Sequence, residues 1–206
     1  GVTNDLAAIQ TAINSITTGT VIIPAGICRI EGTIRLKDGV TLEGQGSDVT
    51  ILLLAGAFYT ATPVHWDTVL ASGAVIKDKI LNNRVAISLI GGANTHPENS
   101  QTYIKNLSIK PASSPSTEYA VTAIYGNFLK GGVENVSSAY CNTGAVLGLN
   151  TAELKGSGKF SNGTYGIKLL QSLDALIQKV DLSNNTIGMD ILSYCTDINV
   201  QAVNFS

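Results

Sequence analysis

The sequence predicts an all-β protein, a single-stranded parallel β-helix in which one chain winds through stacked coils of about 22 residues. The first observation behind this prediction is a repeated glycine: Gly144, Gly166 and Gly188 follow one another at two equal steps of 22 residues. Each glycine also introduces a short segment of alternating apolar and polar residues bounded by Gly, Asn and Ser, which is typical of a strand. A repeat this short leaves no room for a helix, so successive strands are expected to stack about 4.8 Å apart.

A second apolar series runs between these glycines and supports the same fold. Its members recur at steps of 21, 23 and 21 residues: Val133, Leu154, Ile177 and Ile198. Toward the N-terminus, Ile124 and Tyr125 lie one repeat before Ala145 and Val146. Ile104 lies about one further repeat before Ile124, at a less regular spacing. The coils are therefore expected to begin well before the regular part of the sequence.

Composition and charge narrow the class of protein. Of the 206 residues 44% are hydrophobic, 14% are charged and 21 are glycine, which fits one domain with a large core and many tight turns. A net charge of −2 offers no basic surface for nucleic acid, and no apolar run approaches the roughly 20 residues needed to span a bilayer. The three cysteines, Cys28, Cys141 and Cys195, form no CxxC pair, so we expect small buried residues rather than disulfides or a metal site.

The two ends of the sequence suggest part of a longer protein. The chain begins at Gly1 without an initiating methionine or a signal peptide, which fits a processed product or a partial sequence. It stops at Ser206 in the middle of the repeat, without the polar cap that keeps a solenoid end soluble. We therefore expect further protein beyond residue 206.

Residues 3–17 contain the one convincing helix of the sequence. Thr3, Asn4 or Asp5 can cap its start. Apolar residues recur along it at helical spacing: Leu6, Ile9, Ala12, Ile13 and Ile16. The first coil of a solenoid exposes an apolar end and open backbone groups, and we expect this helix to cover both, ahead of coils that run over 20–206.

Three motifs in the first quarter of the chain are specific to a known family. They read Asn-Asp-Leu-Ala-Ala-Ile-Gln-Thr-Ala-Ile at 4–13, Val-Ile-Ile-Pro-Ala-Gly at 21–26 and Gly-Val-Thr-Leu-Glu-Gly-Gln-Gly at 39–46. In this order they resemble the opening of the pectate-lyase-like, right-handed β-helix superfamily. The likeness is closest to the branch of bacteriophage tailspikes and polysaccharide depolymerases. It favours a fold more than a reaction, because hydrolases, lyases, epimerases and non-catalytic adhesins share this fold.

The resemblance also implies an assembly and a location. Tailspikes of this kind are homotrimers in the virion tail, where they meet other tail proteins and act outside the cell on a bacterial capsule or O-antigen. Three β-helices side by side would bury lateral faces, and the clefts between subunits could bind a glycan or share catalytic groups.

Three stretches interrupt the repeat, near 55–86, 91–102 and 111–118, and insertions in a solenoid are commonly loops on its binding face. The first stretch concentrates aromatic and polar residues: Tyr59, His65, Trp66 and Asp67. Aromatic rings stack on the apolar face of a sugar while polar neighbours bind its hydroxyls, so these four residues are predicted to bind substrate. The alternative is that the aromatic residues pack the loop against the coils or a neighbouring subunit.

Stacking of the coils aligns outward-facing residues in columns. Because the residue between the two apolar positions of each Gly-Ile-x-Leu segment faces outward, one column is predicted to contain Tyr125, Val146, Lys168 and Asp190. Tyr125 and Lys168 are predicted to bind a glycan that lies along the helix. A second column with alternating charge is predicted from Lys105, Glu134, Lys155, Gln178 and Asn199. Amides in the turns are expected to form an asparagine ladder: Asn142, Asn162, Asn184 and Asn185.

Catalysis would require a suitable pair of groups. Glycoside hydrolysis uses two carboxylates roughly 5–9.5 Å apart, and Asp181 with Asp190 is the candidate pair, although the two lie on different strands of one coil. A lyase would use a base such as Lys168, Tyr125 or Tyr194. Neither the calcium-binding aspartates of pectate lyases nor the Gly-Asp-Asp strand of polygalacturonases is present, and no metal or cofactor is expected.

The leading hypothesis is a tailspike-type receptor-binding protein that binds a bacterial surface polysaccharide and degrades it, as a glycoside hydrolase or a polysaccharide lyase. The first alternative is a non-catalytic structural or adhesive β-helix of a phage fibre. The second is a secreted bacterial polysaccharide lyase or epimerase, which the missing signal peptide and missing motifs disfavour.

Overall fold

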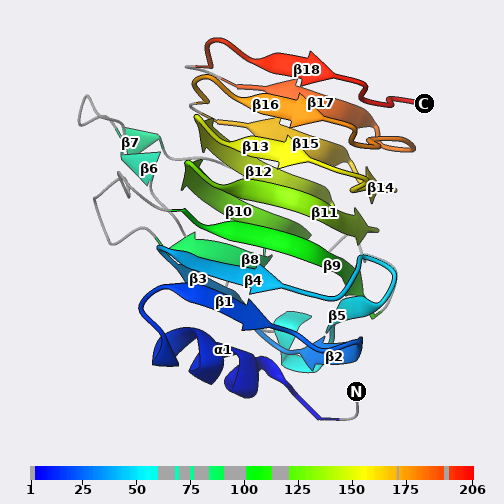
Figure 1. Ribbon diagram of the computed structural model, residues 1–206. Helices are drawn as coiled ribbons and strands as arrows, with labels where there is room; N and C mark the ends of the chain where they lie inside the picture. The colour runs from blue at the N-terminus through cyan, green and yellow to red at the C-terminus, as the bar shows by residue number, and fades with distance from the viewer. Residues whose placement is uncertain are drawn as a thin grey trace.

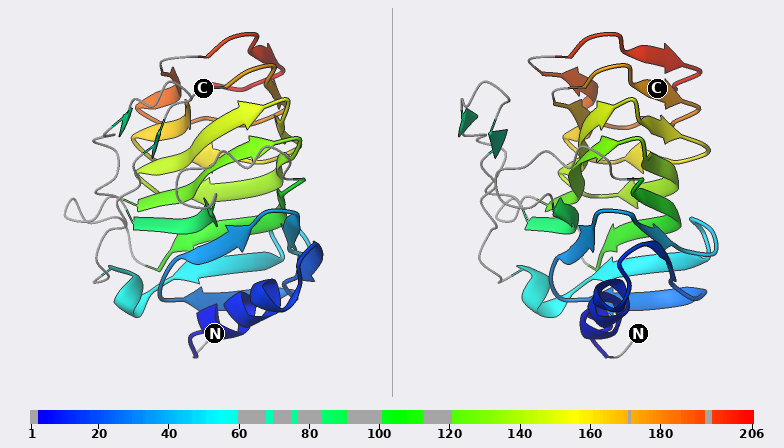
Figure 2. Two further views of the ribbon diagram at one scale, coloured as in Figure 1. Left: turned by 90° about the vertical axis from the view of Figure 1, so that its left-hand side faces the viewer. Right: turned by 60° about the vertical axis from the view of Figure 1, so that its left-hand side comes forward.

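The chain forms a right-handed parallel β-helix. The computed structural model describes residues 3–59, 68–69, 75–76, 84–90, 101–112, 121–170, 172–192 and 195–206. Figure 1 shows the strands stacked one above another, from α1 (Leu6–Ser15) at one end to β18 (Asn199–Gln201) at the other. Both views in Figure 2 show the same linear stack, with the helix across its N-terminal end.

Two sheets wind around the core. Sheet A, with ten strands, runs through β1 (Gly19–Ile22), β4 (Val40–Glu43), β9 (Tyr103–Pro111), β11 (Gly132–Ala139), β13 (Glu153–Lys155), β16 (Leu176–Gln178) and β18. The other three strands of sheet A pair beside this path: β2 (Gly26–Ile30) with β5 (Thr50–Leu54), β5 with β9, and β14 (Phe160–Ser161) with β11. Sheet B, with six strands, consists of β3 (Ile34–Lys37), β8 (Arg84–Ile90), β10 (Val121–Leu129), β12 (Thr143–Asn150), β15 (Tyr165–Leu169) and β17 (Ile187–Ile191).

Every pairing within sheets A and B is parallel, as the repeat predicts. The antiparallel pair β6 (Thr68–Val69) and β7 (Val75–Ile76) lies outside both sheets, and one 3₁₀ turn, η1 (Gly56–Tyr59), follows β5.

Aliphatic ladders fill the space between the sheets. The longest aligns one inward residue from each strand along sheet A: Val21, Leu42, Ile104, Val133, Leu154, Ile177 and Val200. The prediction placed Ile198 after Ile177 in this ladder and Ile104 in the column of Ile124, and both placements are wrong. Val200 pairs with Ile177, and Ile104 pairs with Val133 while Ile87 pairs with Ile124.

The repeated glycines have a steric cause. A Cβ on Gly144 would lie 2.4 Å from the carbonyl oxygen of Gly166, and a Cβ on Gly166 would lie 2.5 Å from that of Gly188. None of the three has a positive φ, so backbone conformation does not require glycine there. The 22-residue period therefore arises from close contact of β12 and β15 with a backbone carbonyl of the next coil.

Helix α1 covers the first coil, as predicted. Ile9 and Ile13 are buried against the coil end. The helix also satisfies open backbone groups: Gln10 Oε1 accepts the Arg35 N–H at 2.9 Å, and Gln10 Nε2 donates to the Arg35 carbonyl at 3.0 Å. The Gln10 amide thus takes the place of a further strand beside β3, which is the N-terminal edge strand of sheet B.

The start of α1 is capped by Asn4, whose Oδ1 accepts the Leu6 N–H at 3.1 Å. Asp5 occupies the N-cap position, but its side chain makes no capping hydrogen bond and instead accepts the N–H of Arg29 in β2 at 2.9 Å. Two of the three candidates therefore have separate roles: Asn4 bonds within the helix, and Asp5 joins the helix to the first coil.

An asparagine ladder is present, but at positions that the sequence analysis missed. Asn135 Nδ2 donates to Asn106 Oδ1 at 3.1 Å, and Asn106 Nδ2 donates to Glu43 Oε1 at 3.0 Å. Two of the predicted residues join coils through backbone groups: Asn142 accepts the Val121 N–H, and Asn185 accepts the Gly163 N–H. The other two predicted residues, Asn162 and Asn184, stand at corners with positive φ, and Asn162 donates to the neighbouring Ser161 hydroxyl.

The three cysteines are free thiols, as predicted, but burial differs among them. Cys141 is buried, and burial raises the pKa of its thiol to about 12, so it is inert as a nucleophile near neutral pH. Cys28 and Cys195 are half-buried rather than buried.

Candidate substrate-binding face

All three long insertions of the chain connect a strand of sheet A with a strand of sheet B. The first insertion leads from β5 into β8, the second leaves β8 for β9, and the third leads from β9 into β10. The first is shorter than predicted, because residues 84–86 already belong to β8. Each insertion therefore begins or ends at β8 or β10, which are neighbours in sheet B.

The predicted column of outward residues lies on this face, in the predicted register. Tyr125 pairs with Val146, Val146 with Lys168, and Lys168 with Asp190. The column continues toward the N-terminus through Ser88 and Arg35. The strand positions are thus confirmed.

The middle of this column is less accessible than expected for an outward face. Val146 is buried, and Lys168 is only 7% exposed, whereas Asp190 is half-buried. The expectation that Lys168 is freely accessible is therefore wrong: its side chain lies on the outer side of the sheet but is covered.

The ammonium of Lys168 is held between two groups of opposite electrostatic character. Its Nζ lies 3.5 Å from the centroid of the Tyr165 ring and 3.9 Å from Asp190 Oδ2. A buried cation is stable only when it is compensated, and here a ring face and a carboxylate share that task. A phenol, a cation and a carboxylate therefore stand within one small cluster on adjacent strands.

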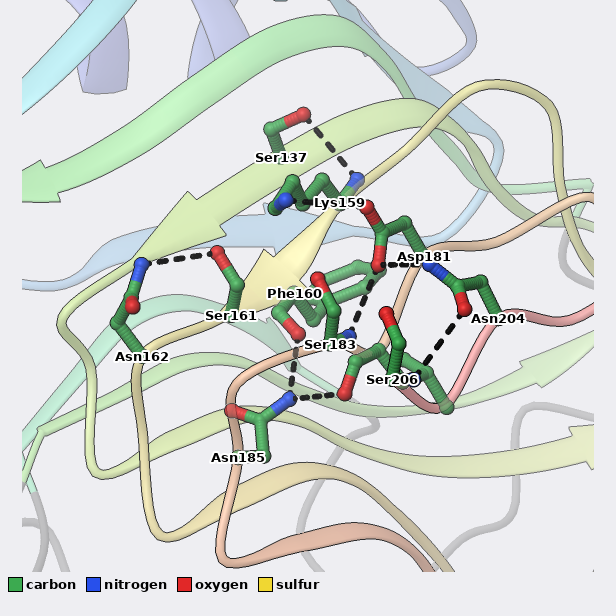
Figure 3. A network of polar contacts seen from close by, with 11 residues as sticks. Ser137, Lys159, Phe160, Ser161, Asn162, Asp181, Ser183, Asn185, Asn204 and Ser206 are labelled. Carbon is green, nitrogen blue, oxygen red and sulfur yellow. Dashed lines mark hydrogen bonds and ion pairs between the residues drawn. The ribbon is translucent and has the colours of Figure 1, made fainter.

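Asp181 lies elsewhere, in a polar network beside β14 (Figure 3). Its Oδ2 is 3.0 Å from Lys159 Nζ, and its Oδ1 accepts the Ser183 N–H at 2.9 Å and the Asn204 amide at 3.3 Å. Burial alone would raise the pKa of Asp181. The hydrogen bonds from Ser183 and the interaction with Lys159 outweigh it, so the pKa lies below its ordinary value.

The structure thus gives Asp181 and Asp190 different lysine partners. Asp190 belongs to β17 of sheet B, and Asp181 forms isolated bridges to Lys159 and Asn204 on the side of sheet A. An ionised, hydrogen-bonded Asp181 suits a structural role better than that of a general acid, which needs a raised pKa.

We expect Asp181→Asn to lower the free energy of unfolding by about 0.5–1 kcal/mol at neutral pH, the range of a half-exposed ion pair. The folded-state pKa is below the unfolded one, so the wild-type advantage is present above the unfolded pKa and disappears as the pH falls through the folded pKa. Urea unfolding of the wild type and the variant across the acid range measures this difference. Asp197→Asn, at an exposed corner, is the control, and a difference for Asp181→Asn that persists in strong acid would contradict the ionic origin.

The sequence as a whole identifies the family. The model of the family described as rhamnogalacturonase A/epimerase, pectate lyase-like, matches residues 1–206. The chain belongs to this family. A search of curated protein sequences found no significant match.

Solved structures of this pectate-lyase-like fold resemble the chain at low sequence identity. The catalytic domain of a GH87 α-1,3-glucanase shares 16% identity at a TM-score of 0.55, over 87% of this chain and 28% of its own. The pectin methylesterase of Erwinia chrysanthemi shares 16% at a TM-score of 0.45, over 85% of this chain and 50% of its own. The A-module of an Azotobacter vinelandii mannuronan C-5 epimerase shares 15% at a TM-score of 0.33, over 98% and 74%.

These likenesses concern the fold. The chain spans well under a third of the glucanase domain and half of the esterase, so it corresponds in length to only part of these proteins.

Several predicted site residues of this pectate-lyase-like chain lie outside the described residues. They are His65, Trp66 and Asp67, together with Tyr194. Tyr59 closes the 3₁₀ turn η1 after β5, but its side chain is outside the description. The binding role predicted for these residues stays a prediction.

The second predicted column is present on sheet A with one correction. Lys105, Glu134, Lys155 and Gln178 are in register, but the last member is Gln201 rather than Asn199. The connection from sheet B to sheet A grows by one residue in each of the last coils, from Leu147–Glu153 through Leu169–Leu176 to Ile191–Asn199. The predicted last step of 21 residues, from Gln178 to Asn199, therefore fell two residues short of Gln201.

Sequence reasoning missed Tyr103, which lies beside this column with the Lys105 ammonium 4.4 Å from its ring centroid. Within the described ranges, no three His, Cys, Asp or Glu side chains gather as a metal would require. In the same part of the chain, no helix is long and apolar enough to cross a membrane.

Proposed function

We propose that this chain is the β-helix of a tailspike-type receptor-binding protein that binds a bacterial surface polysaccharide along the outer face of sheet B and degrades it. In this proposal the protein is a homotrimer in the virion tail, in contact with other tail proteins, and acts outside the cell. The family description, which names a rhamnogalacturonase, an epimerase and a pectate lyase, supports action on a polysaccharide. The resemblance of residues 3–54 to tailspikes supports the location.

The observation that carries the proposal is the cluster of Tyr165, Lys168 and Asp190 on sheet B, the sheet in which each of the three insertions begins or ends at β8 or β10. Binding sites on solenoids favour such faces, because inserted loops can build walls on a rigid floor. A glycan that lies along the stack would follow the column of Tyr125, Val146, Lys168 and Asp190, whose rungs are about 4.8 Å apart. Tyr125 and Asp190, which are half-buried, are the members that it would contact, because Val146 is buried and Lys168 is covered.

The cluster offers the groups that elimination or hydrolysis uses. The Lys168 cation can balance a sugar carboxylate, and Asp190 or the Tyr165 phenol can accept or return a proton. Hydrolysis would need a second carboxylate facing Asp190, and Asp181 has its own partners beside sheet A. In this proposal a neighbouring subunit or an inserted loop supplies that group.

The test is to incubate the full-length protein with capsule and lipopolysaccharide preparations from candidate hosts and to follow new reducing ends and the ultraviolet absorbance of unsaturated uronates. Hydrolysis produces new reducing ends alone, whereas elimination produces both new reducing ends and the ultraviolet absorbance. Asp190→Asn is expected to lower the rate by about 10²–10⁴-fold, the usual contribution of a general acid or base. Asp181→Asn is the matched control and should retain the wild-type rate.

Other outcomes decide against parts of the proposal. Binding without either signal would favour the non-catalytic adhesive β-helix. Equal losses of cleavage rate for Asp190→Asn and Asp181→Asn would contradict an active site on the outer face of sheet B. Light scattering of the full-length protein tests the assembly, and a monomer mass at micromolar concentration would contradict the trimer.

A further inference from the structure

A groove of about 480 Å³ lies away from the face described above, at the corner where strands β1, β4 and β9 of sheet A begin. It is lined by two chain segments and the start of a third: Thr18, Gly19 and Thr20; Gly39 and Thr41; Gln101, Tyr103 and Lys105. Its volume falls within the range of small-ligand sites. The proposed substrate face uses none of these residues.

The strand register brings the polar groups of the groove close together. Thr20 pairs directly with Thr41, and Tyr103 stands next in line because the following residues, Leu42 and Ile104, are paired. Two hydroxyls and an aromatic ring thus occupy three successive rungs, about 4.8 Å apart. A planar apolar surface beside several hydrogen-bonding groups is the combination that fits a sugar ring.

The floor of the groove is backbone held by hydrogen bonds. Gly19 and Gly39 both have positive φ, and the Gly19 N–H donates to the Gly39 carbonyl at 3.1 Å. The Gly39 N–H in turn donates to Thr102 Oγ1 at 3.1 Å. Because no side chain rises from either glycine, the groove is open and pre-formed.

The charge of Lys105 is already compensated. Its Nζ lies 3.4 Å from Glu134 Oε2 and 4.4 Å from the centroid of the Tyr103 ring. Of the eight residues that line the groove, Lys105 is the only charged one. The ammonium is therefore a fixed hydrogen-bond donor rather than an unopposed positive charge, which favours a neutral ligand over an anion.

We infer that this groove is a second carbohydrate site, which binds a neutral pyranose unit with Tyr103 as the stacking surface and Thr20, Thr41 and Lys105 as hydrogen-bonding partners. It lies on sheet A, so it can hold a glycan without occupying the face on sheet B. Its function would be to keep the protein attached to a polysaccharide, independently of any cleavage.

The test uses the ¹⁵N-labelled chain, titrated with the methyl pyranosides of glucose, galactose, mannose and rhamnose, with backbone amide shifts as the readout. At least one of the four should shift the amides of Gly19, Gly39 and Gln101, with a dissociation constant of about 1 mM, as a ligand of this size allows. Added salt should leave this affinity unchanged, because a neutral ligand forms no ion pair.

Three variants separate stacking from hydrogen bonding and from folding. Tyr103→Ala should weaken binding at least about 10-fold, whereas Tyr103→Phe, which keeps the ring, should remain within about 3-fold of wild type. Thr41→Val preserves side-chain shape and removes one hydroxyl, so it should weaken binding by about 3–10-fold even if Tyr103→Ala fails to fold.

Two results would overturn the inference. One is that none of the four pyranosides shifts the groove amides up to about 50 mM, well above the expected millimolar range. The other is that only a methyl galacturonide binds and salt abolishes its binding, which would make the groove an anion site. Both results concern sheet A alone, so they leave the proposed substrate face to its own test.

Discussion

Ile13→Asp is expected to lower the free energy of unfolding by more than about 4 kcal/mol, enough to unfold the first coils. Ile13 lies on the buried side of α1 and is fully enclosed in the core, where a carboxylate would be removed from water. The loss would come from an uncompensated buried charge and from separation of the helix from β1 and β3, the strands that it contacts.

Thermal and urea unfolding, followed by circular dichroism, measure this loss. Ala8→Asp provides the matched control, because Ala8 is exposed on the same helix and an acidic residue near a helix N-terminus is tolerated. Equal stability of the two variants would show that α1 does not serve as a cap.

Gly166→Ala is expected to cost about 3 kcal/mol or more, because the added methyl group has no space to enter. A Cβ there would lie 2.5 Å from the Gly188 carbonyl oxygen and 2.9 Å from the Asn185 amide nitrogen. Backbone cannot move aside as a flexible side chain can, so β15 and β17 would have to separate and lose the parallel pairing between them.

Gly32→Ala is the control for the intrinsic effect of replacing glycine. Its Cβ would approach only the terminal Cδ2 atom of Leu6, which can move, so we expect a change of less than about 1 kcal/mol. If both variants unfold at the same urea concentration, steric contact between coils is not the reason for the 22-residue glycine period.

The sequence by itself determined the parts of the structure that repeat. The glycines at 144, 166 and 188 revealed the coil, and the register of Tyr125, Val146, Lys168 and Asp190 followed from it. The stripe along residues 6–16 revealed the cap. These predictions succeeded because each coil makes the same contacts with the next, so the same steric demand recurs at a constant interval.

Only the tertiary structure decided where that interval fails. Asn106 and Asn135 bond across 29 residues, because an insertion lies between them, and a search at a step of 22 does not pair them. The shift from Asn199 to Gln201 has a related cause, because the corner between sheet B and sheet A lengthens from coil to coil. Corners and loops are solvated, so packing does not constrain their length. The repeat in the sequence therefore does not indicate how many residues each corner contains.

The tertiary structure also decided which side chains are buried and which residues they contact. Lys168 is a polar residue at an outward position, yet it is covered and held by Tyr165 and Asp190. The groove at Tyr103 joins residues 18–20, 39–41 and 101–105, which lie far apart in the sequence. Periodicity states which side of a strand a residue faces, but what lies against that side depends on segments that the period does not describe.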